Sequence, residues 1–185
     1  MAASNAKEKF TGKSAVYEKS RPGYPAACYT YLMETAGLFS RGLLERGLTV
    51  YAVEPNEDMR REAERLLSEV PDWHSFSGTA EHTGLPGQCV ELVTAAQAFH
   101  WFDPGAFREE CRRILKPAGF TALVWNHRDA ESPLVRENAA VCREYCPDFH
   151  GFSGGADHSQ PRYADFFRGG LYETRRFSND LFYTL

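Results

Sequence analysis

The stretch LTVYAVEPN, residues 48–56, predicts a strand that ends on an acid. Residues 48–53 are apolar, β-branched or aromatic enough to form a buried strand, and Glu54 ends it directly before a proline and an asparagine. An acid at this position has two interpretations. It is either an ordinary solvated strand end, or it holds the two ribose hydroxyls of a nucleotide, as the acid after the second strand of a doubly wound sheet does.

The composition sets bounds on the class of protein. The chain has 185 residues, with 43% hydrophobic and 25% charged residues, which suits one globular domain with its own core. The formal net charge of −4 argues against nucleic acid as the main partner. No apolar run is long enough for a membrane span, and the polar start MAASNAKEKF is no secretory signal. We therefore expect a cytoplasmic protein with no membrane or nucleic-acid partner, and the sequence leaves the oligomeric state open.

The cysteines favour reduced thiols over a disulfide framework. Their number is odd and they are scattered along the chain, at Cys28, Cys89, Cys111, Cys142 and Cys146. The group formed by Cys142, Cys146, His150 and His158 resembles a zinc site only loosely, because the spacing C-x3-C-x3-H is not one of the usual ligand patterns. We expect no metal site.

Strands and helices alternate along the chain. The pattern predicts a polar arm over 1–20, helices over 26–36, 39–46, 56–70 and from Pro104, strands over 48–54, 73–77, 90–96 and 120–125, a breaker at KPAG (116–119), a loop over 151–161 and further strand material over 171–185. Short loops between strands that are apolar on both faces are typical of a parallel sheet covered by helices. The expected fold class is therefore α/β, with a doubly wound, mostly parallel sheet and helices on both faces.

Two of the predicted helices have a clear inner face. In the helix that Asn56 caps, the apolar positions are Met59, Ala63, Leu66, Leu67 and Val70. In the helix from Pro104 they are Phe107, Cys111, Ile114 and Leu115. The charge run EDMRREAERLLSE, residues 57–69, is interpreted as a solvated helix face with i,i+4 ion pairs.

Several motifs resemble one known family. GTAEHTGLPGQCVELVTAAQAFHWFD, RRILKPAGF and LVWNHRD are similar to class I S-adenosylmethionine-dependent methyltransferases, and FTGKSAVYEKSRPGYP resembles the start of their trans-aconitate methyltransferase-like, small-molecule branch. The resemblance covers roughly residues 10–130 and implies a Rossmann-like fold. It suggests one domain over 1–185, with an N-terminal arm and helix (1–36), a cofactor-binding core (39–130) and an acceptor-side C-terminal part (131–185).

The resemblance also implies roles for individual residues. S-adenosylmethionine would be the cofactor, with Glu54 on its ribose hydroxyls and Thr79, Ala80 and Glu81 around its adenine. Many relatives have an aspartate where this chain has Thr79, so adenine binding would depend on backbone groups or on Glu81. Ala96 and Gln97, at the end of the fourth strand, would lie beside the reactive sulfonium.

The acceptor implied by the resemblance is a small molecule, with carboxylates among the candidates. Phe99, His100 and Trp101 would line the pocket, and Tyr17 and Arg21 would close over it. A carboxylate needs no base, whereas a hydroxyl, amine or carbon acid would need one, and His100 is the candidate. Two alternatives remain: a nicotinamide-dependent oxidoreductase, which would also use an acid such as Glu54, and a non-catalytic binding protein with a methyltransferase fold.

One expected element is missing. The family places a first strand and a glycine-rich loop, together about a dozen residues, where this chain passes directly from Leu38 to Phe39. Either the chain lacks the segment, so that neighbouring strands lose ladder hydrogen bonds, or further residues separate Leu38 from Phe39 in the whole protein, which predicts a chain break there. The cost of an open gap in a sheet favours the second explanation.

Overall fold

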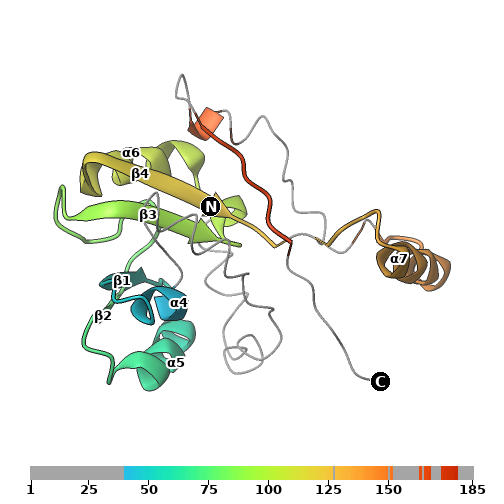
Figure 1. The fold of residues 1–185 in the computed structure, drawn as a ribbon, viewed down its shortest axis with the longest axis horizontal. Helices are drawn as coiled ribbons and strands as arrows, with labels where there is room; N and C mark the ends of the chain where they lie inside the picture. Colours follow the sequence, from blue (N-terminus) through green and yellow to red (C-terminus); the bar gives the residue numbers. More distant parts are fainter. Residues whose placement is uncertain are drawn as a thin grey trace.

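The computed structural model describes residues 40–126, 128–149, 151, 163, 165–167 and 172–178. Their elements, in chain order, are α4 (Ser40–Leu44), β1 (Val50–Val53), α5 (Glu57–Leu67), β2 (Trp73–Phe76), β3 (Val90–Ala96), the 3-10 helix η1 (Phe99–Trp101), α6 (Pro104–Ile114), β4 (Leu115–Val124) and α7 (Pro133–Tyr145) (Figure 1). Within these ranges no helix has both the length and the apolar character that a membrane span needs.

The strands form two separate parallel pairs. β1 pairs with β2 from Val50↔Trp73 to Val53↔Phe76, and β3 pairs with β4 up to Ala96↔Val124. Figure 1 shows the β1–β2 pair with α4 and α5, and the β3–β4 pair with α6 beside it. The predicted parallel α/β class is confirmed. The prediction that residues 48–53, 90–95 and 120–125 share one sheet is wrong for the described chain, because no ladder joins β1 to β3.

The β1–β2 half forms around a capped helix. The side chain of Asn56 accepts a hydrogen bond from Met59 N at 3.0 Å, as predicted for an N-cap, and Asn56 is itself buried. Its core consists of Leu43, Val50 and Trp73, against which Leu44, Leu48, Ala52, Ala63, Leu67 and Val70 pack. Leu66 is 42% exposed and does not belong to the inner face, and α5 ends at Leu67, earlier than predicted.

The β3–β4 half has a second core around Phe99, which is 1% exposed. Asp103 caps α6 by accepting a hydrogen bond from Ala106 N at 2.8 Å, and Pro104 stands in the first turn. The buried residues of this core are Ala95, Phe99, Phe107, Cys111 and Phe166. The predicted inner face of α6 is confirmed for Phe107, Cys111 and Ile114, whereas Leu115 is half-buried and begins β4. The structure adds Glu110, which is buried beside them.

The predicted breaker KPAG lies inside β4. Val90 pairs with Leu115 and Leu92 pairs with Phe120, so residues 116–119 bulge out of the ladder without ending the strand. Ala118 has a positive φ of 65°, and a Cβ on Gly119 would lie 2.8 Å from the Glu91 carbonyl oxygen. The breaker residues therefore interrupt pairing, as turn residues do, but the chain continues in the same direction.

Other predictions meet the structure only in part. The sequence analysis did not predict α7, which stands apart from both strand pairs in Figure 1. The prediction of strand material over 171–185 is wrong for residues 172–178, which form no strand.

Some predictions fall outside the described residues. They concern the polar arm, the helix over 26–36, most of the 151–161 loop and the break at Leu38–Phe39. The full sequence joins Leu38 directly to Phe39, so the explanation that further residues separate them is wrong.

In the part of the chain that the structure describes, no strand covers the facing edges of β1 and β3. Val50 N and Glu54 N donate to Asp72 O (2.7 Å) and Phe76 O (3.1 Å), so the alternate residues Tyr51 and Val53 direct their backbone groups away from β2. By the same alternation, the bond from Gln97 N to Val124 O at 2.9 Å means that Thr94 and Ala96 direct theirs away from β4. No strand in the described ranges pairs with these two edges. This is the consequence expected if the chain lacks a central strand.

We expect the two open edges to exchange amide hydrogens faster than the paired positions of the same strands. The amides of Tyr51, Val53, Thr94 and Ala96 should exchange at least about tenfold faster than those of Val50, Glu54 and Gln97, because the latter must first break a ladder bond. Residue-resolved NMR exchange measures this, and the paired amides are the internal control. Equal protection on both sides of β1 would mean that another segment covers the edge.

Candidate functional site

A cavity of about 890 Å³ lies between the two strand pairs. Along its length it is lined by β1 and β3, and at the carboxyl ends of the strands by the loops that follow them. Most of the predicted site residues meet there: the lining includes Glu54, Thr79, Ala80, Glu81, Ala96, Gln97 and Trp101. His100 is not among the lining residues, and Tyr17 and Arg21 lie outside the described residues.

Glu54 follows the last residue of β1 and is half-buried. Its Oε1 accepts a hydrogen bond from Asn56 N at 2.8 Å, and no residue in the described part of the chain is recorded on its Oε2. Burial raises the pKa of the Glu54 carboxyl above its usual value, while the Asn56 amide and the nearby Arg60 charge lower it. Arg60 donates to the Glu54 backbone oxygen at 3.3 Å and to Ser77 rather than to the carboxylate. The site thus contains a carboxylate whose burial is only partly compensated.

A closed turn carries the predicted adenine residues. Thr79 N donates to His82 O at 3.0 Å, and His82 N donates to Thr79 O at 3.2 Å and to the Thr79 hydroxyl at 3.1 Å. Glu81 Oε1 accepts from Asp103 N at 2.9 Å, so this carboxylate holds the start of α6 as well as lining the cavity. Thr79 and Glu81 are therefore partly engaged in holding the turn.

Gln97 marks the end of β3 with an unusual backbone. Its φ is +53°, a left-handed conformation that costs a non-glycine residue energy and is concentrated at ligand sites. Its side-chain amide donates to Asn126 O at 3.1 Å, which ties it to the chain beyond β4. Ala96, the preceding residue, is half-buried and lines the same cavity.

The aromatic residues after Gln97 divide between cavity and core. Trp101 and Phe102 line the cavity, whereas Phe99 fills the centre of the second core. The His100 ring lies against Trp101, with ring centroids 4.7 Å apart. The structure therefore places His100 beside Trp101 but outside the cavity lining.

The sequence analysis missed one polar cluster near the cavity. Glu110 on α6 accepts hydrogen bonds from Thr83 N and from Arg113, and Thr83 also lines the cavity. These bonds, led by that of Arg113, lower the pKa of Glu110 to about 2. The only sequence signal was the i,i+3 spacing of Glu110 and Arg113, which by itself suggests a solvated ion pair.

The described residues contain no group of three or more His, Cys, Asp or Glu side chains arranged to hold a metal ion. Cys142 lies half-buried in α7 and Cys146 is exposed just after it, while His150 and His158 lie outside the described residues.

Comparison with known proteins identifies the fold. Residues 35–123 match the family model of a methyltransferase domain. The chain is 36% identical over 139 residues to an uncharacterized methyltransferase of Mycobacterium tuberculosis, and the match covers 69% of this chain and 56% of that protein. Over this range the chain is similar to methyltransferases. This similarity agrees with the two parallel strand pairs and with the acid after β1.

Two further proteins show the same similarity. An uncharacterized methyltransferase of Schizosaccharomyces pombe is 32% identical over 145 residues, covering 71% of this chain and 57% of the relative. A solved structure described as a candidate type II methyltransferase from Anaeromyxobacter dehalogenans superposes with a TM-score of 0.55 at 35% identity, over 68% of this chain and 56% of the other. The chain thus spans little more than half the length of the curated relatives that it matches.

Replacing Glu54 by glutamine should stabilise the ligand-free protein at neutral pH. Because the folded-state pKa of Glu54 is raised, its ionised form costs stability above that pKa, and the cost disappears as the pH falls toward 4.5. Glu54→Gln removes the charge but keeps an acceptor for Asn56 N. We expect a melting temperature about 2–4 °C higher at pH 7 and no gain below pH 4.5, measured by thermal unfolding. Glu69→Gln, at an exposed acid near the end of the adjacent helix, is the control. A lower melting temperature for Glu54→Gln at pH 7 would contradict this account.

Proposed function

We propose that this chain binds S-adenosylmethionine at the carboxyl ends of its strands and transfers the methyl group to a small-molecule acceptor. One observation carries the proposal: Glu54, the Thr79–Glu81 turn and Gln97, from three separate segments, line a single cavity. Open α/β sheets bind ligands at this edge. The similarity to a methyltransferase domain and to methyltransferase-named relatives supports the reaction class, and the relatives' names specify no acceptor.

The donor set fits the nucleoside half of this cofactor. A ribose diol offers two O–H donors, and Glu54 offers a carboxylate that is desolvated and has accepted one hydrogen bond, from Asn56 N. The diol would restore the hydrogen bonds that burial removes. The half-buried backbone of Ala80 provides an edge for adenine, and Trp101 provides an aromatic wall.

When bound, S-adenosylmethionine supplies an electrophilic methyl group on a sulfonium, and the protein supplies position and desolvation. In this proposal Glu54 fixes the ribose, the Thr79–Glu81 turn fixes the adenine, and Ala96 and Gln97 face the reacting end. A carboxylate acceptor reacts without a base. A hydroxyl or amine acceptor needs a base, and His100 is the sequence-based candidate; because its ring lies beside Trp101 and not on the cavity, it would have to turn toward the cavity to take the proton. Tyr17 and Arg21 would complete the acceptor side, as in the trans-aconitate methyltransferase-like branch.

A second candidate is a non-catalytic binding protein. It is favoured by the extension of the cavity along β1 and β3, where two backbone edges lie open. A nicotinamide-dependent oxidoreductase would also use an acid such as Glu54 but has no further feature in its favour.

A methyl-transfer assay tests the proposal. The protein is incubated with S-adenosylmethionine labelled in its methyl group and a panel of small carboxylic acids, alcohols and amines. We expect label in a base-labile ester if the acceptor is a carboxylate, and His100→Ala should then change the rate less than about threefold. With an O–H or N–H acceptor the same variant should lose about 10²–10⁴-fold. If no acceptor takes up label, the chain is not the enzyme proposed here.

A further inference from the structure

The turn that carries Thr79, Ala80 and Glu81 is closed but cannot set its own position. Its backbone bonds join Thr79 to His82 within the turn, and Gly78 lets the chain pass close by, since a Cβ there would lie 2.7 Å from Thr83 O. These contacts determine the shape of the turn. The position of the turn relative to the strands depends on contacts with other parts of the chain.

Glu110 provides the main anchor. Its Oε1 accepts hydrogen bonds from Thr83 N at 2.8 Å and from the Thr83 hydroxyl. Arg113 donates to both carboxylate oxygens, at 2.7 and 2.8 Å, and also to Leu85 O at 2.7 Å. Four donors thus converge on one carboxylate that is 6% exposed, and the same arginine reaches the chain two residues after Thr83.

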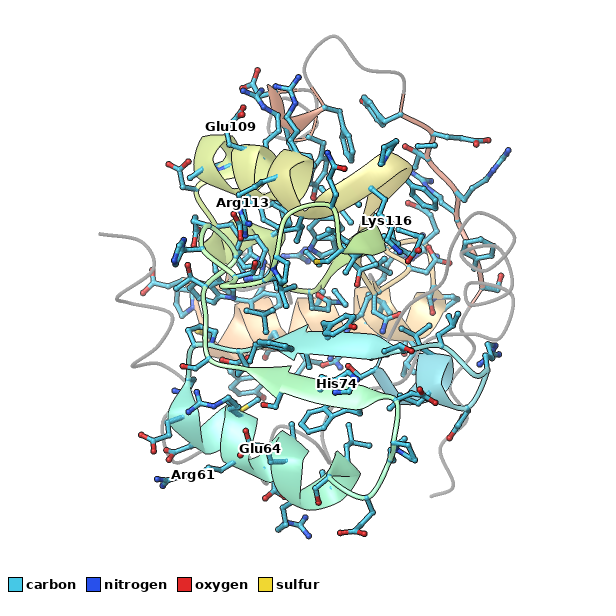
Figure 2. The ribbon with its side chains drawn as sticks, turned by 90° about the vertical axis from the view of Figure 1, so that its left-hand side faces the viewer. Arg61, Glu64, His74, Glu109, Arg113 and Lys116 are labelled. Atoms are coloured by element: carbon cyan, nitrogen blue, oxygen red, sulfur yellow. The ribbon has the colours of Figure 1, made fainter. Side chains whose placement is uncertain are left out.

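The position of Glu110 is unusual for a packed helix. Phe107, Cys111 and Ile114 on α6 are buried and apolar, and a buried carboxylate costs free energy unless it is fully hydrogen-bonded. Apart from the bonds with Arg113, the side-chain hydrogen bonds of Glu110 go to the loop after β2 rather than to its own helix. Figure 2 shows Glu109 on the outer side of α6 and Arg113 on the side toward the rest of the molecule. The contacts therefore join α6 to the loop.

The turn has a second anchor, at Glu81 within it. Glu81 accepts from Asp103 N, directly before α6, so the start of α6 holds the turn in addition to Glu110. Glu54, the residue assigned to the ribose, lines the same cavity as the turn. A shift of the turn would change the distance between the adenine and ribose contacts.

We infer that Glu110 is a positioning residue for the cofactor. With Arg113 and Thr83, it holds the Thr79–Glu81 turn in the position at which one nucleoside can contact both the turn and Glu54. This inference rests on the proposed function. It assigns to the Glu110–Thr83 contact an effect on nucleoside affinity, in addition to any effect on folding.

Two pairs of variants separate positioning from stability. Thr83→Val removes the hydroxyl at similar size and leaves the Glu110–Arg113 pair intact, whereas Thr83→Ser retains the hydroxyl. Glu110→Gln removes the charge, and Glu109→Gln is its exposed control on the same helix. Titrations with S-adenosylmethionine and with adenosine are measured on each folded variant.

We expect Thr83→Val to weaken both ligands about five- to twentyfold and Glu110→Gln about ten- to a hundredfold, with equal losses for adenosine and for the whole cofactor. Thr83→Ser and Glu109→Gln should stay within about twofold. In the ligand-free protein, NMR should show faster exchange at the Thr83 and His82 amides of Glu110→Gln only. A lower melting temperature with unchanged affinities would show that the contact is merely structural and overturn the inference.

The inference and the proposed function fail in different ways. If the unsubstituted protein binds neither S-adenosylmethionine nor adenosine, the proposed function is wrong and the link from Glu110 to the cofactor is lost with it. If that protein binds both ligands but Thr83→Val and Glu110→Gln bind them equally well, only the positioning role is wrong.

Discussion

The Glu54→Ala variant is expected to bind S-adenosylmethionine about ten- to a thousandfold more weakly than the unsubstituted protein. The variant loses the carboxylate that would accept two hydrogen bonds from the ribose, each worth roughly 1.5–3 kcal/mol before non-additivity. Folding should change little, because the gain from removing a partly compensated buried charge is offset by the loss of the hydrogen bond that Glu54 Oε1 accepts from Asn56 N. Isothermal titration of both proteins measures the difference.

Two controls make this result specific. Glu69→Ala removes an exposed acid outside the cavity lining and should leave the affinity unchanged. Glu54→Gln keeps the size and one acceptor oxygen and should lie between the alanine variant and the unsubstituted protein. Equal affinities of Glu54→Ala and the unsubstituted protein would mean that the acid is only the solvated end of a strand.

The second large effect concerns stability. Phe99→Ala should lower the free energy of unfolding of the β3–β4 half by about 3–5 kcal/mol, the usual cost of emptying a buried aromatic site. Phe99 is 1% exposed and touches several rings, with centroids 5.1 Å from Phe166 and 6.1 Å from Phe107. A loss of this size is a large share of the stability of an ordinary domain.

The loss should be confined to one half of the molecule. Phe99 belongs to the core of β3, β4 and α6, while Leu43, Val50 and Trp73 form a separate core, and no ladder joins β1 to β3 in the described chain. Amide exchange should therefore accelerate in β3 and β4 of Phe99→Ala and stay nearly unchanged at the β1–β2 ladder. Leu66→Ala, at an exposed position of α5, is the control for a leucine-sized deletion. Equal acceleration in both halves would contradict the two-core description.

Local sequence signals predicted the elements well. Asn56 and Pro104 start helices where their capping and first-turn preferences place them, and the apolar run over 90–96 forms β3 with those bounds. The sequence also predicted correctly that the Glu54 carboxylate stands at the end of β1, because the strand, the acid and the helix cap follow one another closely in the chain.

Non-local relations could not be predicted in the same way. The sequence pattern identifies strands but not their partners, so the split into two sheets follows only from the absence of a strand to join β1 and β3 in the described chain. Glu110 contradicts the apolar pattern of its helix face, and its partner Thr83 lies on another loop. His100 and Trp101 belong to the motif that suggested a pocket wall, but only Trp101 lines the cavity, because neighbouring residues of η1 face different directions.

The central claim is that the cavity beside Glu54 is a site for S-adenosylmethionine. Its most direct test is a calorimetric titration of the 185-residue protein with S-adenosylmethionine and, separately, with NAD. The account predicts saturable one-to-one binding of S-adenosylmethionine, competition by S-adenosylhomocysteine and no binding of NAD. Binding of NAD in place of S-adenosylmethionine, or no binding of either, would contradict it.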